Sequence, residues 1–310
     1  MNKTIPDGVY PTMLTPYTDD NKIDFNAIGQ MLDWYWKRGV TGIFAICQSS
    51  EIFYLSFEEK LEILKYIMAH KPAQMKVVAS GHTADDLETQ IKEAQAYIDC
   101  GIDAYVFISN RFANADESDD VLFERMSYVM SKLPDDTMFG VYECPYPYKR
   151  CLTPYLMKKM ADSGKFAFLK DTCCSMEQIQ GKLDAVKGTN FKIFNANAAL
   201  LLESLYAGCC GYSGVMANFH PEIYAELVNC YKTDKEKAAI LGDFVGFASV
   251  AECHVYPINA KYYMSLDGVE IMPYSRVRDI AEFPLNRQIE IDEMYRITKF
   301  FNKQMGITIK

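Results

Sequence analysis

The sequence has 310 residues, of which 49% are hydrophobic and 24% are charged, and its formal net charge at pH 7 is -9. This composition excludes a disordered chain, and no apolar run approaches the ~20 residues that a membrane-spanning helix needs. The acidic balance, with 32 Lys and Arg against 41 Asp and Glu, argues against nucleic acid or an anionic membrane surface as a partner.

The first residues and the cysteine spacing bear on location and metal binding. The start, MNKTIPDGVYPTML, has one Lys and no long apolar segment, so we expect no secretory signal and a cytoplasmic location. The ten cysteines include no CxxC spacing, and the four histidines are too scattered for a zinc motif. We therefore expect reduced thiols and no metal site.

One unit recurs along the chain: an amphipathic run ends at a glycine, and a short apolar run follows within a few residues. The glycines are Gly39, Gly101, Gly164, Gly188 and Gly208. Glycine readily adopts the left-handed conformation that ends a helix, and an almost entirely apolar run is typical of a buried parallel strand. With two runs that follow prolines and one near the N-terminus, this pattern predicts eight strands starting near residues 9, 41, 76, 103, 138, 166, 191 and 211.

Helices are predicted between these strands. Ser56 and Glu59 have the spacing of a capping box, as do Ser175 and Gln178, and 153–154 is a Thr N-cap followed by Pro. Eight strands that alternate with helices predict a parallel sheet closed as a (β/α)8 TIM barrel, an α/β fold. An open doubly wound sheet is the alternative, but no glycine-rich phosphate loop follows the first strand.

The strand pattern stops near Pro221. We expect a barrel over residues 1–221 and a C-terminal helical extension over residues 222–310, packed on the barrel as part of one catalytic unit. Within the extension, helices are expected over about 225–253 and about 289–302.

Lys170 is the most informative residue at the end of a predicted strand. In (β/α)8 barrels, chemistry takes place at the carboxyl ends of the strands. Lys170 closes the apolar run 166–169, so its amine is expected to emerge into the barrel mouth. Desolvation there favours the neutral amine that a Schiff-base nucleophile requires. A lysine that points to solvent or pairs with Asp171 is the alternative.

Other strand ends contribute further polar groups. Tyr142 could transfer a proton through its phenol, although an ordinary buried tyrosine is also compatible with this position. Ser49 and Ser50 could cradle a carboxylate, or simply form the turn after their strand. Arg111, Lys149 and Arg150 could bind an anionic or hydroxylated substrate tail, or could simply lie on a solvated surface, and Asn197 is a further polar candidate at a strand end.

Taken in order, these segments resemble the dihydrodipicolinate synthase / N-acetylneuraminate lyase family. CQSSE followed by YLSFEEK resembles the family's GTTGE and LSxEE blocks. YECP resembles YNVP, which carries the family's catalytic tyrosine, and FLKDT resembles the strand that carries its Schiff-base lysine. GYSGVMANFHPE and YPINAKYYMSLDGV resemble later family segments, so the resemblance extends from Gly8 to about Ile280.

The resemblance implies a barrel with C-terminal helices, commonly a homotetramer, that acts on pyruvate or another 2-keto acid without a metal or an organic cofactor. Lys170 would form the imine and Tyr142 would carry the proton. Ser49, with the backbone of Ser50, would hold the keto-acid carboxylate. Thr172 resembles the threonine that contacts substrate in the lyase branch of the family.

Four positions depart from the family pattern. Gln48 stands where the family has a proton-relaying hydroxyl, which a carboxamide does not replace. Phe112 stands where dihydrodipicolinate synthases place a tyrosine donated across the dimer interface, and Pro147 where they place a carboxylate-binding arginine. Glu143 replaces an asparagine and adds a potential acid or base beside Tyr142.

Because of these departures, we do not expect dihydrodipicolinate synthase activity. We expect a Schiff-base lyase (aldolase) that acts on pyruvate or a 2-keto-3-deoxy sugar acid and cleaves or forms a carbon–carbon bond to pyruvate. A dehydratase that uses the same imine is the alternative. A non-catalytic relative that only binds keto acids is a further one.

Overall fold

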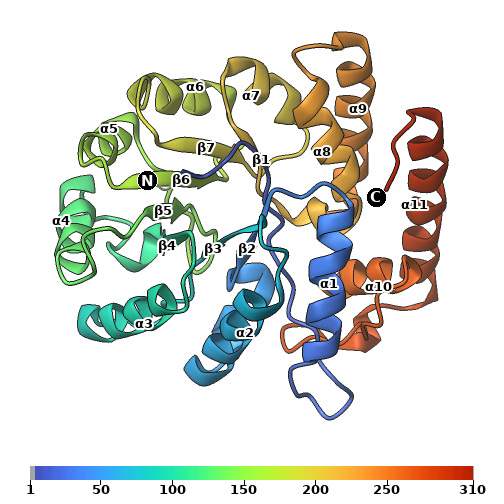
Figure 1. Cartoon of the computed structure of the whole chain (residues 1–310), viewed down its shortest axis with the longest axis horizontal. Coiled ribbons are helices and arrows are strands. Elements are labelled where there is room, and N and C mark those ends of the chain that lie inside the picture. Colours follow the sequence, from blue (N-terminus) through green and yellow to red (C-terminus); the bar gives the residue numbers. More distant parts are fainter. Residues whose placement is uncertain (1–3, 310) are drawn as a thin grey trace.

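The strands of the computed structural model, which describes residues 4–309, lie parallel around one axis (Figure 1). The sheet order is β1-β8-β7-β6-β5-β4-β3-β2, and a bridge between Thr12 and Phe44 joins the two ends of the sheet. Every strand begins within one residue of its predicted start, which confirms the (β/α)8 barrel. The strands are β1 (Gly8–Val9), β2 (Gly42–Ala45), β3 (Lys76–Ala79), β4 (Ala104–Ile108), β5 (Phe139–Tyr142), β6 (Phe166–Asp171), β7 (Lys192–Asn195) and β8 (Gly211–Tyr212).

Helices follow the strands and cover the outside of the barrel. Ser56 and Glu59 form the predicted capping box, and Thr153 caps a helix that has Pro154 at its first position. The Ser175 side chain accepts a hydrogen bond from the Gln178 backbone N–H. The helices are α1 (Phe25–Lys37), α2 (Phe57–His70), α3 (Leu87–Asp99), α4 (Asp119–Met130), α5 (Pro154–Asp162), α6 (Met176–Ala185), α7 (Leu201–Ala207) and α8 (Pro221–Cys230).

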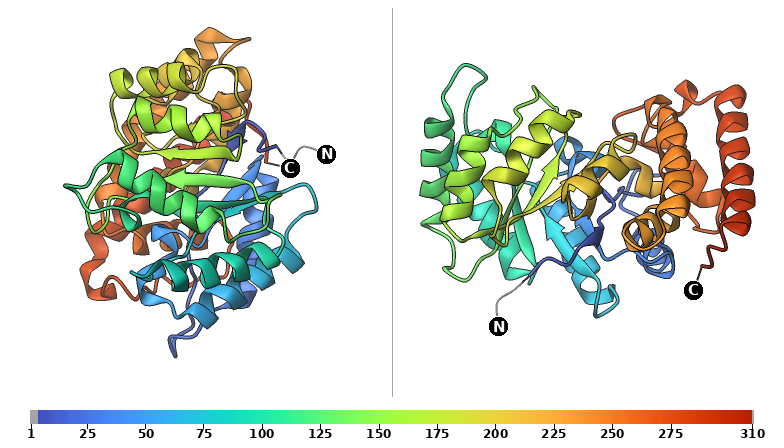
Figure 2. Two further views of the ribbon diagram at one scale, coloured as in Figure 1. Left: turned by 90° about the vertical axis from the view of Figure 1, so that its left-hand side faces the viewer. Right: turned by 90° about the horizontal axis from the view of Figure 1, so that it is seen from above.

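Three more helices lie together at one side of the barrel (Figure 2). They are α9 (Lys235–Ala248), α10 (Ile258–Leu266) and α11 (Leu285–Gln304). The helix α8 begins at Pro221 and packs against β1 and β8, so it completes the last β/α unit of the barrel. The boundary expected at residue 221 therefore falls inside this unit, because the hydrophobic pattern shows where the strands stop but not which strand the next helix covers.

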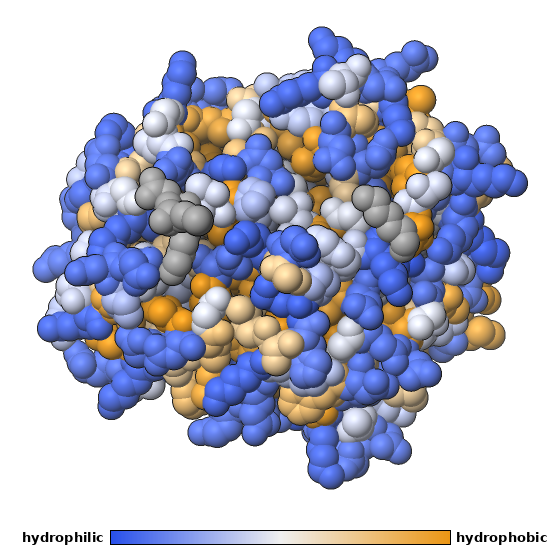
Figure 3. Space-filling model, in the orientation of Figure 1, coloured by the Kyte–Doolittle hydropathy of each residue, from blue (hydrophilic) through white to orange (hydrophobic). Residues whose placement is uncertain are grey.

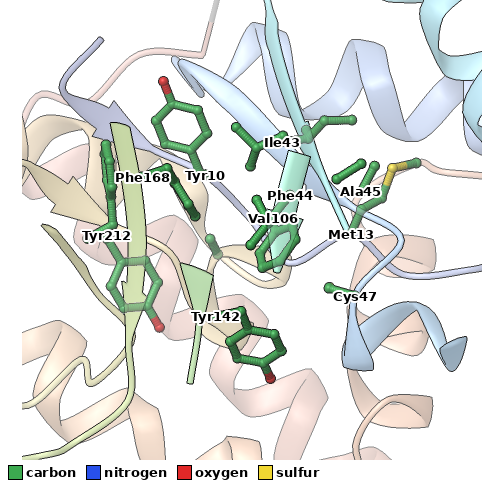
Figure 4. Packing of buried hydrophobic residues seen from close by; sticks show 14 of the residues in the cluster. Tyr10, Met13, Ile43, Phe44, Ala45, Cys47, Val106, Tyr142, Phe168 and Tyr212 are labelled. Carbon is green, nitrogen blue, oxygen red and sulfur yellow. The ribbon is translucent and has the colours of Figure 1, made fainter. Parts of the chain in front are cut away.

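Aromatic side chains fill the interior of the barrel. The centroid of the Tyr10 ring lies 4.9 Å from that of Phe194 and 5.6 Å from that of Phe168. The ring centroids of Phe44 and Tyr142 are 5.6 Å apart, and all three pairs have edge-to-face geometry. Figure 4 shows the rings of Tyr10, Phe44, Tyr142 and Phe168 converging; Tyr10 directly follows β1, and the others belong to β2, β5 and β6. Large rings in a barrel make a packed core rather than a pore, so a ligand can enter only at the ends.

The face of the molecule drawn in Figure 3 is mainly hydrophilic, with smaller hydrophobic areas between the polar side chains. Among residues 4–309, no helix is both long enough and apolar enough to cross a membrane.

Polar contacts, one of them fully buried, join the C-terminal extension to the barrel. The Lys261 ammonium of α10 lies 2.8 Å from the Glu51 carboxylate, and both side chains are almost completely buried. The Arg276 guanidinium donates to both carboxylate oxygens of Glu59 at 2.8 and 2.9 Å. A bidentate pair fixes geometry as well as charge, so these contacts set the position of the segment that follows α10.

Candidate active site

A cavity of about 730 Å³ opens at the carboxyl ends of the strands. Its wall is made partly by the barrel and partly by the extension. The barrel contributes Gln48, Ser49, Tyr142, Lys170, Thr172 and Asn197. The extension contributes Glu252, Cys253, Tyr256 and Arg278. A concave site at this end of a barrel is the usual place for catalysis.

Lys170 and Tyr142 lie side by side at the centre of this site. They are direct neighbours in the register of β5 and β6, and the Lys170 Nζ lies 4.1 Å from the centroid of the Tyr142 ring. Alternation along β6 turns Phe168 and Lys170 towards the barrel interior. Burial lowers the pKa of Lys170 from its ordinary value, despite the thiols of Cys47 and Cys144 nearby. The amine is therefore more readily available as a neutral nucleophile than an exposed lysine.

The Tyr142 phenol is oriented by Gln48. Its hydroxyl donates to the Gln48 Oε1 at 3.2 Å, and the Cys144 thiol donates to the same oxygen at 3.5 Å. Burial raises the pKa of Tyr142 well above its ordinary value, with a further contribution from Cys144. The phenol therefore stays protonated, and it points towards a carboxamide oxygen that can accept a hydrogen bond but cannot pass a proton on.

Two β-branched residues beside the cavity have left-handed backbone conformations. Ile46 has φ 49° and leads from β2 into the 3₁₀ turn η1 (Gln48–Ser50). Val255 has φ 57° and immediately precedes Tyr256. Such conformations are strained for β-branched residues and persist where the surrounding structure holds them. In both cases the strained residue lies within two positions of a side chain on the cavity wall.

The two serines of η1 have different surroundings. Ser49 lines the cavity. The Ser50 hydroxyl donates to the Met13 carbonyl at 2.6 Å, and its backbone N–H donates to the Cys47 carbonyl at 2.9 Å. The structure thus places Ser49 at the site, whereas Ser50 holds the turn in shape and does not line the cavity.

Glu143 points away from the cavity, contrary to our expectation of an acid or base beside Tyr142. Its carboxylate lies 2.5 Å from the Lys182 ammonium of α6, which also lies 2.5 Å from Asp171, and all three side chains are fully buried. Burial and the neighbouring Asp171 raise the pKa of Glu143. The expectation was wrong because successive side chains alternate along an extended chain, so the residue after Tyr142 faces the helices.

Glu143 instead ties together the loops that carry the site. Its carboxylate accepts hydrogen bonds from the backbone N–H groups of Leu152 at 2.7 Å and Thr172 at 2.8 Å. The Thr172 hydroxyl donates to the Glu143 carbonyl at 2.7 Å, and Thr172 lines the cavity.

The expected cationic residues divide into two groups. Lys149 lies on the cavity wall, whereas Arg111 and Arg150 do not. The Arg111 guanidinium donates to Asp85 at 2.7 Å and to the Thr83 carbonyl. The Arg150 guanidinium donates to Asp119 at 3.1 Å. Both arginines thus form hydrogen bonds with neighbouring segments instead of facing the cavity. Spacing along the sequence gives no indication of such partners.

Phe112 and Asn197 also have defined places. Phe112 is 1% exposed and packs against Phe107 and His82 of its own chain. Asn197 lines the cavity, and its side-chain amide donates to the Cys174 thiol at 3.3 Å.

The residues that the extension supplies to the cavity were not predicted from the strand ends. Tyr256 is within the YPINAK segment already singled out, and its phenol oxygen accepts a hydrogen bond from Asn218 at 3.0 Å. Glu252 belongs to η5 (Ser249–Cys253), and Arg278 follows α10. Within residues 4–309, no group of three or more His, Cys, Asp or Glu side chains is placed to hold a metal ion.

Comparison with known proteins gives a consistent result. The family model described as "Dihydrodipicolinate synthetase family" matches residues 5–277. The 4-hydroxy-tetrahydrodipicolinate synthase of Methanothrix thermoacetophila is 24% identical over 224 residues, which cover 72% of this chain and 74% of that protein. The putative 2-dehydro-3-deoxy-D-gluconate aldolase YagE of Escherichia coli K12 is 26% identical over 236 residues, covering 75% of this chain and 76% of YagE.

Solved structures share the fold over almost the whole chain. The crystal structure of YagE in complex with pyruvate has a TM-score of 0.83 at 20% identity and covers 97% of this chain and 99% of YagE. The sialic acid aldolase of Ruminococcus gnavus has a TM-score of 0.82 at 19% identity and covers 94% of this chain and 98% of that protein.

Proposed function

Because the chain belongs to the dihydrodipicolinate synthetase family, we propose that it is a Schiff-base lyase that cleaves or forms a carbon–carbon bond to pyruvate, with a 2-keto-3-deoxy sugar acid as substrate. The observation that carries the proposal is the buried Lys170 amine, held 4.1 Å from the centroid of the Tyr142 ring in an open cavity. The pyruvate complex of YagE and the aldolase activity named for two of the similar proteins support it.

The first part of the reaction joins substrate and enzyme. Ser49 holds the carboxylate of the keto acid, and the neutral Lys170 amine attacks the C2 carbonyl carbon. The attacking nitrogen gives up one proton to the oxygen and Tyr142 donates a second, so that the oxygen leaves as water, a protonated imine remains on Lys170, and Tyr142 is left as a phenolate. The C4 hydroxyl then gives its proton to the Tyr142 phenolate, and the positive nitrogen accepts the electron pair of the C3–C4 bond as that bond breaks. The aldehyde fragment leaves, the enamine takes a proton at C3, and water releases pyruvate from Lys170.

Three observations support a sugar acid rather than aspartate semialdehyde as the second substrate. Gln48 stands in place of a relaying hydroxyl, Pro147 stands in place of an arginine, and Phe112 is buried within its own chain. Asn197, Lys149 and Arg278 supply polar contacts for a hydroxylated tail. Turnover of aspartate semialdehyde with pyruvate would overturn this choice, and the similar synthase of Methanothrix thermoacetophila makes that assay necessary.

We expect borohydride to trap pyruvate on Lys170. The protein is incubated with pyruvate, reduced and digested, and the added mass is located by peptide mapping. A reduced adduct on Lys170 supports the imine. No adduct with pyruvate or with a panel of longer keto acids, from folded protein, contradicts it. Sugar acids are then screened, because cleavage releases pyruvate whereas a dehydratase, the second candidate, does not.

Tyr142→Phe is expected to lower turnover by about 10²–10⁴-fold, because the variant loses the proton donor of every step at the keto oxygen. The imine is expected to form more slowly but on the same lysine, and the fold is expected to lose about 1 kcal/mol, the value of one hydrogen bond. Steady-state kinetics, trapping rates and urea unfolding check the three expectations. Tyr206→Phe, on the exposed face of α7, is the matched control, and equal activity of the two variants would contradict the assignment.

We also propose that the chain forms a homo-oligomer and works in the cytoplasm. Apolar side chains on the extension support the first point: Phe247 of α9 is 76% exposed and Phe300 of α11 is 66% exposed. Large apolar side chains on a surface are typical of a protein–protein interface.

A further inference from the structure

Two aromatic rings form part of the cavity wall, and the mechanism described above gives them no role. Phe53 of the 3₁₀ turn η2 (Ile52–Tyr54) and Tyr146, in the loop after β5, both line the cavity. Their ring centroids lie 5.0 Å apart with edge-to-face geometry, and Tyr146 is 54% exposed. Large aromatic side chains left exposed beside a cavity are typical of a surface that a ligand covers.

The two loops that carry these rings meet at two depths. At the inner contact, the buried Tyr142 phenol donates to the Gln48 Oε1 at 3.2 Å. At the outer contact, the ring of Phe53 meets that of Tyr146. The Cys144 thiol joins the two, because it lies 3.5 Å from the Gln48 Oε1 and 3.4 Å from the Tyr146 carbonyl oxygen. One continuous wall therefore leads from the catalytic phenol outwards to the aromatic pair.

Hydrogen bonds to the backbone hold both loops in place. The Asn110 side-chain amide donates to the carbonyls of Cys144 and Tyr146, both at 2.9 Å. The Arg276 guanidinium donates to the Tyr54 carbonyl of η2 at 2.9 Å. These bonds involve main-chain oxygens, so they do not depend on either aromatic ring. The rings are thus presented on a fixed backbone, which spares a ligand the entropic cost of ordering the surface.

The strand order places polar groups across the cavity from this wall. The rings come from the loops after β2 and β5, which flank β3 and β4, and the strands opposite these two in the closed sheet are β7 and β8. Asn197 follows β7 and Thr172 follows β6, and both line the cavity. The cavity is therefore aromatic on one side and offers hydrogen bonds on the other.

The tail of a sugar acid matches this division. Each hydroxylated carbon also carries a C–H group, so an extended chain can turn its C–H groups to the rings and its hydroxyls to the polar side. Contact with an aromatic face supplies dispersion and removes apolar surface from water. Pyruvate ends at its methyl carbon, C3, and has no atoms that reach beyond the imine towards the rings.

We propose that Phe53 and Tyr146 determine specificity for the aldehyde half of the substrate, and that they favour keto acids with a hydroxylated chain beyond C4 over keto acids without one. The rings recognise that such a chain is present, whereas polar groups elsewhere on the wall distinguish its individual hydroxyls. This role rests on the lyase function proposed above. It also accounts for a cavity of about 730 Å³, a volume typical of sites for ligands larger than pyruvate.

Tyr146→Ala and Phe53→Ala test the proposal, with Tyr206→Ala as the matched control. Tyr206 lies outside the cavity, is 49% exposed, and has its ring centroid 5.9 Å from that of Tyr231, so it belongs to a comparable aromatic pair. Borohydride trapping on Lys170 is measured at increasing concentrations of pyruvate and of a six-carbon 2-keto-3-deoxy sugar acid. Adducts of either length are counted together, because cleavage converts the longer acid into pyruvate.

We expect each alanine variant of the aromatic pair to need about tenfold more of the six-carbon acid for half-maximal trapping, because an aromatic contact is lost. Both variants are expected to need the same concentration of pyruvate as the wild type. Tyr206→Ala is expected to match the wild type with both acids, and Tyr146→Phe, which keeps the ring, is expected to retain the preference. The kcat for pyruvate release is expected to stay within threefold of wild type, since the rings touch no reacting atom.

Three results would overturn this role. One is an equal loss with pyruvate and with the six-carbon acid, which would mean that the substitutions displace Tyr142 through its loop. Another is half-maximal trapping of the six-carbon acid within twofold of wild type in both alanine variants. The third is a wild type that needs as much of the six-carbon acid as of pyruvate, or more. A wild type that traps no keto acid at all would instead refute the lyase function.

Discussion

Lys170→Ala is expected to lower turnover by about four orders of magnitude or more, because the variant has no nucleophile with which to form the imine. The loss is measured as pyruvate release from a sugar acid, and borohydride trapping is expected to leave no adduct at position 170. Lys165→Ala is the control, since Lys165 immediately precedes the opposite end of the same strand and pairs with Asp135 at 3.6 Å. Turnover near the wild-type level in Lys170→Ala would contradict the mechanism.

At position 170, a substitution that abolishes activity is expected to preserve or increase the stability of the fold. Burial lowers the pKa of Lys170, so the unfolded chain binds a proton that the folded chain holds less well. Stability therefore rises with pH until the ordinary lysine pKa is reached. Lys170→Met removes this penalty, and we expect it to be at least as stable as wild type near neutral pH. The difference in free energy of unfolding between the variant and the wild type is expected to become smaller as pH rises. Urea unfolding at several pH values would measure it.

Lys182→Met is expected to destabilise the fold by about 3–5 kcal/mol, because it leaves Glu143 and Asp171 buried without their cation. Although burial opposes its charge, the two carboxylates raise the pKa of Lys182, so the ammonium is present throughout the normal pH range. Urea unfolding measures the loss. Activity is expected to fall as well, since Glu143 also holds the Thr172 backbone.

The pH dependence distinguishes this explanation from simple loss of packing. Without Lys182, nothing offsets the burial that already raises the pKa of Glu143, so the folded chain binds a proton more readily than the unfolded chain does. The variant should therefore gain stability as pH falls towards 5, whereas a packing defect would be insensitive to pH. Lys187→Met, an exposed residue just beyond α6, is the control and is expected to change stability by less than about 0.5 kcal/mol.

The barrel was predictable because its strands are buried on both faces. A run such as 104–108 is entirely apolar and follows a helix that ends at a glycine, and both signals are local in sequence. The positions of Lys170 and Tyr142 on the cavity wall were predictable for the same reason, because each follows a local apolar run and strand alternation turns its side chain inwards.

The rest of the site depended on contacts between distant segments. Arg111 pairs with Asp85 because the loops after β3 and β4 meet in the fold. The periodicity of the sequence does not indicate that contact. The position of Glu252 depends on how the extension is fixed by pairs such as Lys261 with Glu51, which are 210 positions apart. The outward orientation of Glu143 could have been predicted, because side chains alternate between the two faces of an extended strand.

The joint construction of the cavity has an evolutionary consequence. The groups that make and break the imine are carried by β5 and β6 in the barrel core, whereas Glu252, Tyr256 and Arg278 come from a separate stretch of chain. Sequence drift in that stretch could change which aldehyde is released while leaving the attack on the keto carbon intact. Proteins with the same barrel could then diversify their substrates by exchanging residues 249–278 alone, and grafting that stretch between relatives would transfer substrate preference without rebuilding the catalyst.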